Sequence, residues 1–128
     1  MNISVVVADD HQIIRQGLRL LFGSQPDMQL VGEAENGQEA VDLVAQLQPQ
    51  VTIMDVSMPV LDGFEATRLV KTQHPHVKVI ALSMHNDPIF IEGMKAVGAD
   101  GYVLKDAAFE QLAEAIHTVM AGGQFFPD

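Results

Sequence analysis

Short apolar runs alternate along the chain with longer stretches in which apolar residues recur every three or four positions. The short runs are rich in β-branched residues and are bounded by Gly, Pro or Asp, which is typical of strands, whereas the longer periodic stretches are typical of amphipathic helices. The pattern predicts five strands, over residues 3–8, 28–34, 51–54, 77–82 and 101–105. A predicted helix follows each strand, so the two kinds of element alternate throughout.

Polar residues that can cap a helix mark the start of each predicted helix. An Asp or Asn side chain before the first turn accepts hydrogen bonds from N–H groups that have no partner within the helix. The candidate caps are Asp10, Asn36, Asp62, Asp87 and Asp106. Pro88 directly follows Asp87, and Gly122-Gly123 ends the last helix; these are favoured places for the two residue types.

The alternation of strands and helices indicates an α/β fold. Each right-handed crossover lays its helix back on the sheet, so we expect a parallel sheet covered by helices on both faces. A chain of 128 residues, 48% of them hydrophobic, fits one such domain. In open sheets of this kind, ligands bind outside the carboxyl ends of the strands. The residues that follow the strands are therefore the candidate site.

The composition of the chain excludes several kinds of chemical site and argues against a membrane or nucleic-acid-binding protein. The chain has no cysteine, which excludes a disulfide framework, a thiolate metal site and a thiol nucleophile. Its apolar runs are too short to span a bilayer, and its start does not resemble a signal peptide, so we expect a soluble cytoplasmic protein without a membrane partner. The net charge of −10 argues against nucleic-acid binding by these residues, because such binding needs clustered Lys and Arg.

Acidic, hydroxyl and ammonium groups gather where the predicted strands end. Asp9 and Asp10 follow the first strand, Asp55 ends the third, and Ser83 and Lys105 end the last two. Carboxylates that lie this close repel one another unless a cation neutralises them, and oxygen ligands suit a hard ion such as Mg²⁺. One carboxylate can then attack phosphorus while the metal, the hydroxyl and the ammonium stabilise the phosphoryl oxygens. We therefore place phosphoryl transfer at Asp55.

Other polar side chains near these strand ends have simpler interpretations. We interpret Asp62 as a helix cap, and His11 and His85 as surface or turn residues. No cysteine or paired histidine supports a transition-metal site. Tyr102, the only tyrosine, has two interpretations, as packing at the sheet edge or as part of a switch.

Four motifs in this order resemble the receiver domain of bacterial two-component response regulators, over essentially the whole chain. They are Asp9-Asp10, Asp55-x-x-Met58-Pro59-x-x-Asp62-Gly63, Ser83 and Gly101-Tyr102-Val103-Leu104-Lys105. Each motif alone is a weak signal, but four at this spacing are specific. The segments Asp9-Asp10-His11, Arg15-x-Gly17-Leu18, Leu82-Ser83-Met84-His85 and Leu104-Lys105-Asp106 are similar to the NarL/FixJ-type subgroup.

The resemblance implies a flavodoxin-like (βα)5 sandwich with strand order 2-1-3-4-5. It also implies that Asp55 accepts a phosphoryl group from a sensor histidine kinase. Mg²⁺ would be bound directly by Asp10, by Asp55 and by the backbone carbonyl of Ser57, with Asp9 acting partly through water. The domain would catalyse its own phosphorylation and dephosphorylation without being an enzyme in the ordinary sense.

The resemblance further implies a switch at the same edge of the sheet. Lys105 would pair with the phosphoryl group, Ser83 would move toward it, and Tyr102 would change rotamer as Ser83 moves. The surface of the last two helices and the last strand would then change partners, with homodimerisation on phosphorylation as one outcome. Three positions depart from the family pattern: Met84 is large where a small residue is common, Asp106 follows the lysine where proline is common, and Gln12 stands where proline is frequent in the subgroup.

Proteins of the NarL/FixJ type usually carry a helix-turn-helix DNA-binding domain after the receiver. We expect residues 1–128 to be a receiver truncated before such a domain, so that DNA binding and transcription regulation belong to the missing part. Two other functions remain open. A Mg²⁺-dependent phosphatase of the haloacid-dehalogenase type needs a second Asp two residues after the nucleophile, where this chain has Ser57. The third function is that of an interaction module that keeps the fold without phosphorylation.

Overall fold

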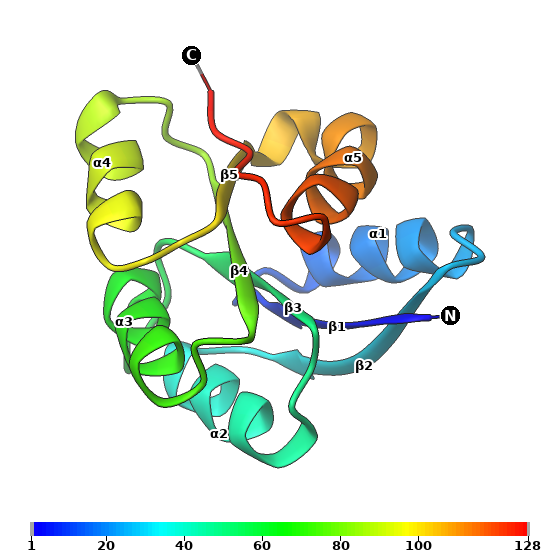
Figure 1. The fold of residues 1–128 in the computed structure, drawn as a ribbon, viewed down its shortest axis with the longest axis horizontal. Helices are drawn as coiled ribbons and strands as arrows, with labels where there is room; N and C mark the ends of the chain where they lie inside the picture. Colours follow the sequence, from blue (N-terminus) through cyan, green and yellow to red (C-terminus); the bar gives the residue numbers. More distant parts are fainter. Residues whose placement is uncertain (1, 128) are drawn as a thin grey trace.

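Five parallel strands form one sheet in this computed structural model, which describes residues 2–127. The strands are β1 (Ile3–Ala8), β2 (Met28–Ala34), β3 (Val51–Asp55), β4 (Lys78–Ser83) and β5 (Gly101–Leu104). Their order is β2-β1-β3-β4-β5, and every neighbouring pair is parallel. The predicted α/β class and strand order are therefore confirmed, and the carboxyl ends of all five strands meet at one edge (Figure 1).

Helices cover both faces of the sheet. They are α1 (Gln12–Gly23), α2 (Gly37–Leu47), α3 (Gly63–Gln73), α4 (Pro88–Ala96) and α5 (Ala108–Met120). α1 and α5 lie on one face, and α2, α3 and α4 on the other (Figure 1). Because successive side chains of a strand point to opposite faces, Ile53 packs with the α1/α5 core and Met54 with the α2/α3 core. Both residues are fully buried, which explains why the third strand is apolar throughout.

Two of the predicted helix caps form as expected. The side-chain Oδ1 of Asn36 accepts from the N–H of Glu39 at 2.9 Å, and the Asp62 carboxylate accepts from the N–H of Glu65 at 2.9 Å. Asp87 occupies the N-cap position of α4, with Pro88 next to it, but its side chain makes no capping hydrogen bond.

The predictions of Asp10 and Asp106 as helix caps are wrong. His11 is the N-cap residue of α1, because Asp10 belongs to an acidic cluster at the strand ends. After β5 the chain continues as a 3₁₀ turn, η1 (Lys105–Ala107), so α5 begins only at Ala108. Neither helix start has a side-chain cap. Among the described residues no peptide bond is cis, so the bond between Lys105 and Asp106 is trans.

The segment after α5 adds to the outer edge of the sheet. The Tyr102 N–H donates to the Phe125 carbonyl at 2.7 Å, and the Phe125 N–H donates to the Asp100 carbonyl at 3.1 Å. Phe126 packs among apolar side chains of α4 and β5, and the Lys95 ammonium lies 4.9 Å from the centre of its ring. This short segment covers part of the β5 edge, which would otherwise expose unpaired backbone groups.

Within residues 2–127 we find no helix that combines the length and the apolar composition needed to cross a bilayer.

Candidate functional site

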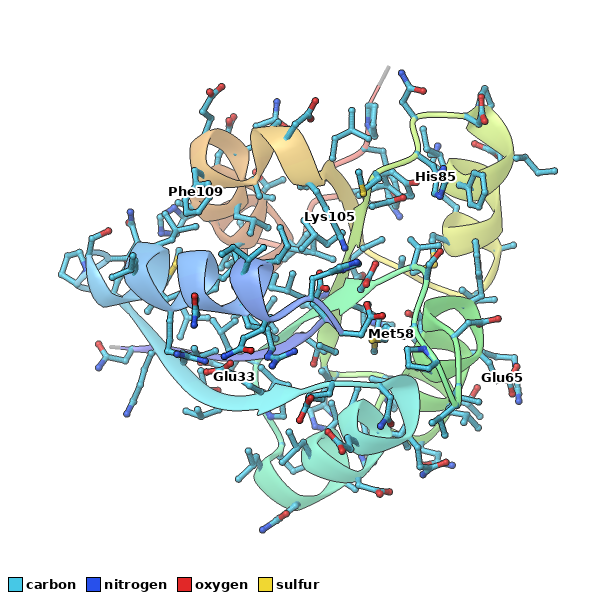
Figure 2. The ribbon with its side chains drawn as sticks, turned by 180° about the vertical axis from the view of Figure 1, so that it is seen from behind. Glu33, Met58, Glu65, His85, Lys105 and Phe109 are labelled. Carbon is cyan, nitrogen blue, oxygen red and sulfur yellow. The ribbon has the colours of Figure 1, made fainter. Side chains whose placement is uncertain are left out.

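Side chains from four strands meet at the carboxyl edge of the sheet. Asp9 directly follows β1, Asp55 ends β3, Ser83 ends β4 and Lys105 follows β5. The parallel register aligns these ends, because Asp55 lies opposite Leu82 and Ser83 lies opposite Leu104. Lys105 extends from the end of β5 over the ends of the neighbouring strands (Figure 2). The structure thus brings together residues that are far apart in the sequence.

The Lys105 ammonium bridges two buried carboxylates. Its Nζ lies 3.0 Å from Oδ2 of Asp9 and 3.3 Å from Oδ2 of Asp55. Asp9 is completely buried and Asp55 is 2% exposed. Apart from this ammonium, neither Oδ2 atom has a hydrogen-bond partner. Two buried carboxylates facing one ammonium leave an excess of negative charge, which favours binding of a further cation.

This environment changes the acidity of Asp55. Burial raises the pKa of its carboxyl from 3.8 to about 7, and the Asp9 charge acts in the same direction. The Lys105 ammonium and the N–H of Ser57, which donates to Oδ1 of Asp55 at 3.3 Å, oppose that rise. A cation beside the carboxylate would favour its ionised, nucleophilic form.

The acidic cluster can hold a metal ion. Asp9, Asp10, His11 and Asp55 each offer one ligand atom, and the four atoms lie within 4.8 Å of one another. The unpartnered Oδ2 atoms of Asp9 and Asp55 belong to the same cluster. Carboxylate oxygens are the ligands that Mg²⁺ prefers, so the donor set fits this ion.

The backbone of His85 connects Ser83 to Tyr102. Its N–H donates to Oγ of Ser83 at 2.9 Å, and its carbonyl accepts from the Tyr102 hydroxyl at 2.6 Å. Tyr102 is buried, and this burial raises the pKa of its hydroxyl. The His85 ring stacks on Phe90 of α4 with ring centres 4.3 Å apart. A displacement of Ser83 would therefore alter the contacts of His85 with both Tyr102 and α4.

A small cavity of about 70 Å³ opens above Asp55. Its wall is formed by His11, Asp55, Ser57, Ser83, Met84, His85 and Lys105. The Met84 side chain stands at the rim and is 76% exposed. The Asp55 carboxylate thus lines a small cavity together with Ser83 and Lys105.

Comparison with known proteins agrees with this architecture. A family model described as the response regulator receiver domain matches residues 5–117. The chain belongs to the response regulator receiver family.

Relatives of this receiver domain include transcriptional regulators. It is 38% identical to the transcriptional regulatory protein DegU of Brevibacillus brevis over 124 residues, which are 97% of this chain and 52% of DegU. It is 36% identical to the response regulator GacA of Pseudomonas syringae over 123 residues, which are 96% of this chain and 58% of GacA. The chain thus spans little more than half the length of these relatives.

Solved structures show the same receiver fold. A LuxR-family response regulator from Aurantimonas superposes with a TM-score of 0.92 at 30% identity, covering 98% of this chain and 89% of the other. The non-phosphorylated receiver domain of RcsB from Escherichia coli gives 0.92 at 30% identity and covers all of both chains. Together with DegU and GacA, these relatives place the receiver in the NarL/FixJ-type subgroup, as the sequence motifs predicted.

Two residues of the receiver's site were not predicted from the sequence. Nδ1 of His11 lies 2.9 Å from Oδ1 of Asp9, so this histidine belongs to the acidic cluster and not only to a turn. The Arg15 side chain donates to the backbone carbonyl of Asp9 at 2.6 Å and lies 3.4 Å from Glu33, which fixes the end of β1. For His11 the available signal was its place directly after two acids, whereas Arg15 was noted only as part of a subgroup motif, with no role assigned to its side chain.

Proposed function

We propose that this receiver domain is a phosphorylation-activated signalling switch that accepts a phosphoryl group on Asp55 from a sensor histidine kinase. One observation carries the proposal. Oδ2 of Asp55 is buried in the wall of a small cavity, and apart from the Lys105 ammonium 3.3 Å away it has no hydrogen-bond partner. A nucleophilic oxygen and a cation that can stabilise the transferred group are thus side by side.

We propose Mg²⁺ as the metal of this site. Asp10, Asp55 and the backbone carbonyl of Ser57 would hold it directly, and Asp9 would act partly through water. When bound, Mg²⁺ supplies positive charge that neutralises the carboxylates and stabilises the oxygens of the transferred group.

Asp55, Lys105 and Ser83 would have different roles in the phosphoryl transfer. An Asp55 oxygen attacks the phosphorus of a phosphohistidine, the new O–P bond forms as the N–P bond breaks, and the electron pair returns to the imidazole of the kinase. Lys105 pairs with a phosphoryl oxygen, and the Ser83 hydroxyl donates to another. In dephosphorylation, water attacks the same phosphorus and the Asp55 carboxylate leaves. The domain would thus catalyse both reactions on itself.

The switch would use the connection through His85. Movement of Ser83 toward the phosphoryl group breaks or redirects the hydrogen bond from the His85 N–H, which is 2.9 Å long in this structure. The carbonyl of the same residue holds the Tyr102 hydroxyl, so Tyr102 changes rotamer together with the loop. A local charge then biases a two-state element at α4 and β5.

The output of the switch would be transcription regulation. We propose that residues 1–128 are the receiver part of a cytoplasmic regulator whose DNA-binding domain follows the receiver. Support comes from the greater length of DegU and GacA, of which this chain spans 52% and 58%. Homodimerisation on phosphorylation would present two such domains to DNA.

A mass measurement of the intact protein tests the proposed phosphoacceptor. Incubation with Mg²⁺ and acetyl phosphate should add one phosphoryl group to the wild-type protein and none to Asp55→Asn. Asp62→Asn is the matched control, because it alters an acid that caps α3 outside the acidic cluster, and it should be labelled like the wild type. Labelling of Asp55→Asn would contradict the proposal.

A further inference from the structure

The His11 side chain faces the acidic cluster instead of solvent alone. Its Nδ1 lies 2.9 Å from Oδ1 of Asp9 and 3.3 Å from Oδ1 of Asp10. The Lys105 ammonium lies 3.3 Å from the same ring nitrogen. The imidazole therefore places a nitrogen beside the carboxylate oxygens of Asp9 and Asp10.

The distances around Nδ1 fit ligands of one shared ion. In an octahedral site with ligands at about 2.1 Å from the metal, adjacent ligand atoms lie about 3.0 Å apart. The two distances from Nδ1 to the carboxylate oxygens lie close to this value. By this measure one ion can contact Nδ1 of His11 together with a neighbouring carboxylate oxygen such as that of Asp10.

A separate observation points to a cation at this place. The buried Oδ2 atoms of Asp9 and Asp55 share the single Lys105 ammonium and have no other hydrogen-bond partner, and both acids belong to the same cluster as His11. This excess of two buried carboxylates over one ammonium does not depend on the contacts that His11 makes. The site thus favours a second cation for reasons unrelated to the histidine, and the histidine lies beside it.

We infer that His11 is an additional metal ligand, so that the site binds transition-metal ions such as Co²⁺ and Mn²⁺ more tightly than a site made of oxygens alone. This inference rests on the proposed metal-dependent function and specifies the metals that the site accepts. Imidazole nitrogen suits first-row transition metals, whereas Mg²⁺ strongly prefers oxygen and keeps several waters. His11 would therefore add to the affinity for Co²⁺ and contribute little to that for Mg²⁺.

Metal titrations of three proteins test this inference without any phosphodonor. Dissociation constants for Co²⁺ and Mg²⁺ are measured on the wild type, His11→Ala and His85→Ala. His85 is the matched control, because it lines the same cavity but lies outside the four-residue cluster. We expect His11→Ala to lose at least about tenfold in Co²⁺ affinity, since even indirect partners of metal ligands typically contribute that much, while its Mg²⁺ affinity changes less than about twofold. His85→Ala should keep both affinities.

Pulsed electron paramagnetic resonance of the Mn²⁺-loaded protein gives an independent readout. A ¹⁴N modulation from a coordinated imidazole should be present in the wild type and in His85→Ala, and absent from His11→Ala. Should His11→Ala fail to fold, His11→Gln removes the same imidazole and is measured in its place.

Unchanged Co²⁺ affinity in the His11 variant, equal loss for both metals, equal loss in His85→Ala, or a persisting ¹⁴N signal would each overturn the inference. The mass measurement with Asp55→Asn in Mg²⁺ tests the proposed function separately. Failure of that function and failure of this metal preference are therefore distinguishable.

Discussion

At the scale of single residues, Asp55 shows how the fold changes the chemistry of one carboxylate. Burial and the neighbouring Asp9 oppose its ionisation, and Lys105 supports it. Folding the metal-free protein with Asp55 ionised is therefore costly, and this cost is what makes a bound cation effective. We therefore expect this residue to make the stability of the protein depend on pH.

The first prediction concerns this pH dependence in the absence of metal. Because the pKa of Asp55 is about 7 in the folded protein and 3.8 when unperturbed, the folded state binds more protons across that window. The protonated Asp55 carboxyl stabilises the folded state. This contribution is fully present below about pH 4 and is lost as the pH rises through about 7. Asp55→Asn should therefore gain stability relative to the wild type as the pH rises.

Denaturant unfolding with a chelator, from about pH 5 to about pH 8, checks this expectation. Saturating Mg²⁺ should reverse this change in relative stability with pH. The ion stabilises the wild type with Asp55 ionised, whereas Asp55→Asn offers the ion one carboxylate fewer. A stability difference that does not vary with pH in the chelated proteins would contradict the assigned role of burial at Asp55.

Val60 is a residue whose conformation is unfavourable and whose side chain contributes little. Its φ is +70°, in the left-handed region that β-branched residues avoid, and it stands in a tight turn closed by Leu61 N–H and the Pro59 carbonyl at 2.7 Å. The side chain is 80% exposed. We expect Val60→Gly to raise the free energy of unfolding by about 1 kcal/mol, measured by denaturant titration. Destabilisation by the glycine would show that the Val60 side chain makes a contact that outweighs the strain.

The sequence predicted most of the residues in the site but not their full set. Asp9, Asp10, Asp55, Ser83 and Lys105 were found because they follow predicted strands, and parallel strands end at one edge. His11 was interpreted as a turn residue, since its role depends on how its ring turns back toward Asp9. The direction of a side chain in a turn is set by tertiary contacts, which no local pattern contains.

At the scale of elements, local patterns located the strands better than the helix starts. The predicted strands over residues 3–8 and 28–34 coincide with β1 and β2, because their β-branched residues and flanking turns are local features. Asp10 and Asp106 have the residue type of a cap, but one belongs to the acidic cluster and the other lies in η1. The pairing of Phe125 with the edge of β5 was also missed, because it depends on a contact between distant residues.

One ion pair connects α3 to the loop before β5. The Lys71 ammonium lies 3.0 Å from Oδ2 of Asp100 and 3.0 Å from the Val77 carbonyl, and the Asp100 carboxylate also accepts from the N–H of Val79 at 2.9 Å. Both charged side chains are largely buried. We expect Lys71→Met to lower the free energy of unfolding by about 2 kcal/mol, because it leaves a buried carboxylate without its cation.

Arg68 on the same helix offers a control for that substitution. It pairs with Glu65 at the surface, so Arg68→Met should cost less than about 1 kcal/mol. The double variant Lys71→Met/Asp100→Asn should lose less free energy of unfolding than the two single variants lose together, because Asp100→Asn removes the charge that Lys71→Met leaves unpaired. Equal costs for Lys71→Met and Arg68→Met in the same unfolding assay would contradict the importance of burial.

At the scale of the whole molecule, the topology suggests how phosphorylation at one small site would affect a distant surface. The sheet order brings β3 and β4 together at its centre, so Asp55 lies next to the strand that carries Ser83. In the loop after Ser83, the His85 carbonyl accepts a hydrogen bond from the Tyr102 hydroxyl, and the His85 ring stacks on Phe90 of α4. Phosphorylation is therefore expected to change the surface around α4, β5 and α5.

Dimerisation is one expected consequence of this change. The last helix, or the surface it shares with α4, would pair with the same surface of a second chain after activation. Light scattering should give a larger mass with Mg²⁺ and beryllofluoride, the phosphomimetic used with the RcsB receiver, than with Mg²⁺ alone. Equal masses at all protein concentrations would contradict phosphorylation-driven dimerisation.

The most direct test of the central claim is the position of the phosphoryl group. Borohydride reduces an acyl phosphate to an alcohol, which converts a phosphorylated Asp to homoserine. After labelling with Mg²⁺ and acetyl phosphate, peptide mass spectrometry should find homoserine at position 55 and unchanged Asp at positions 9 and 10. Homoserine at Asp9 or Asp10, or a phosphoryl group on His11, would contradict the assignment of Asp55 as the phosphoacceptor.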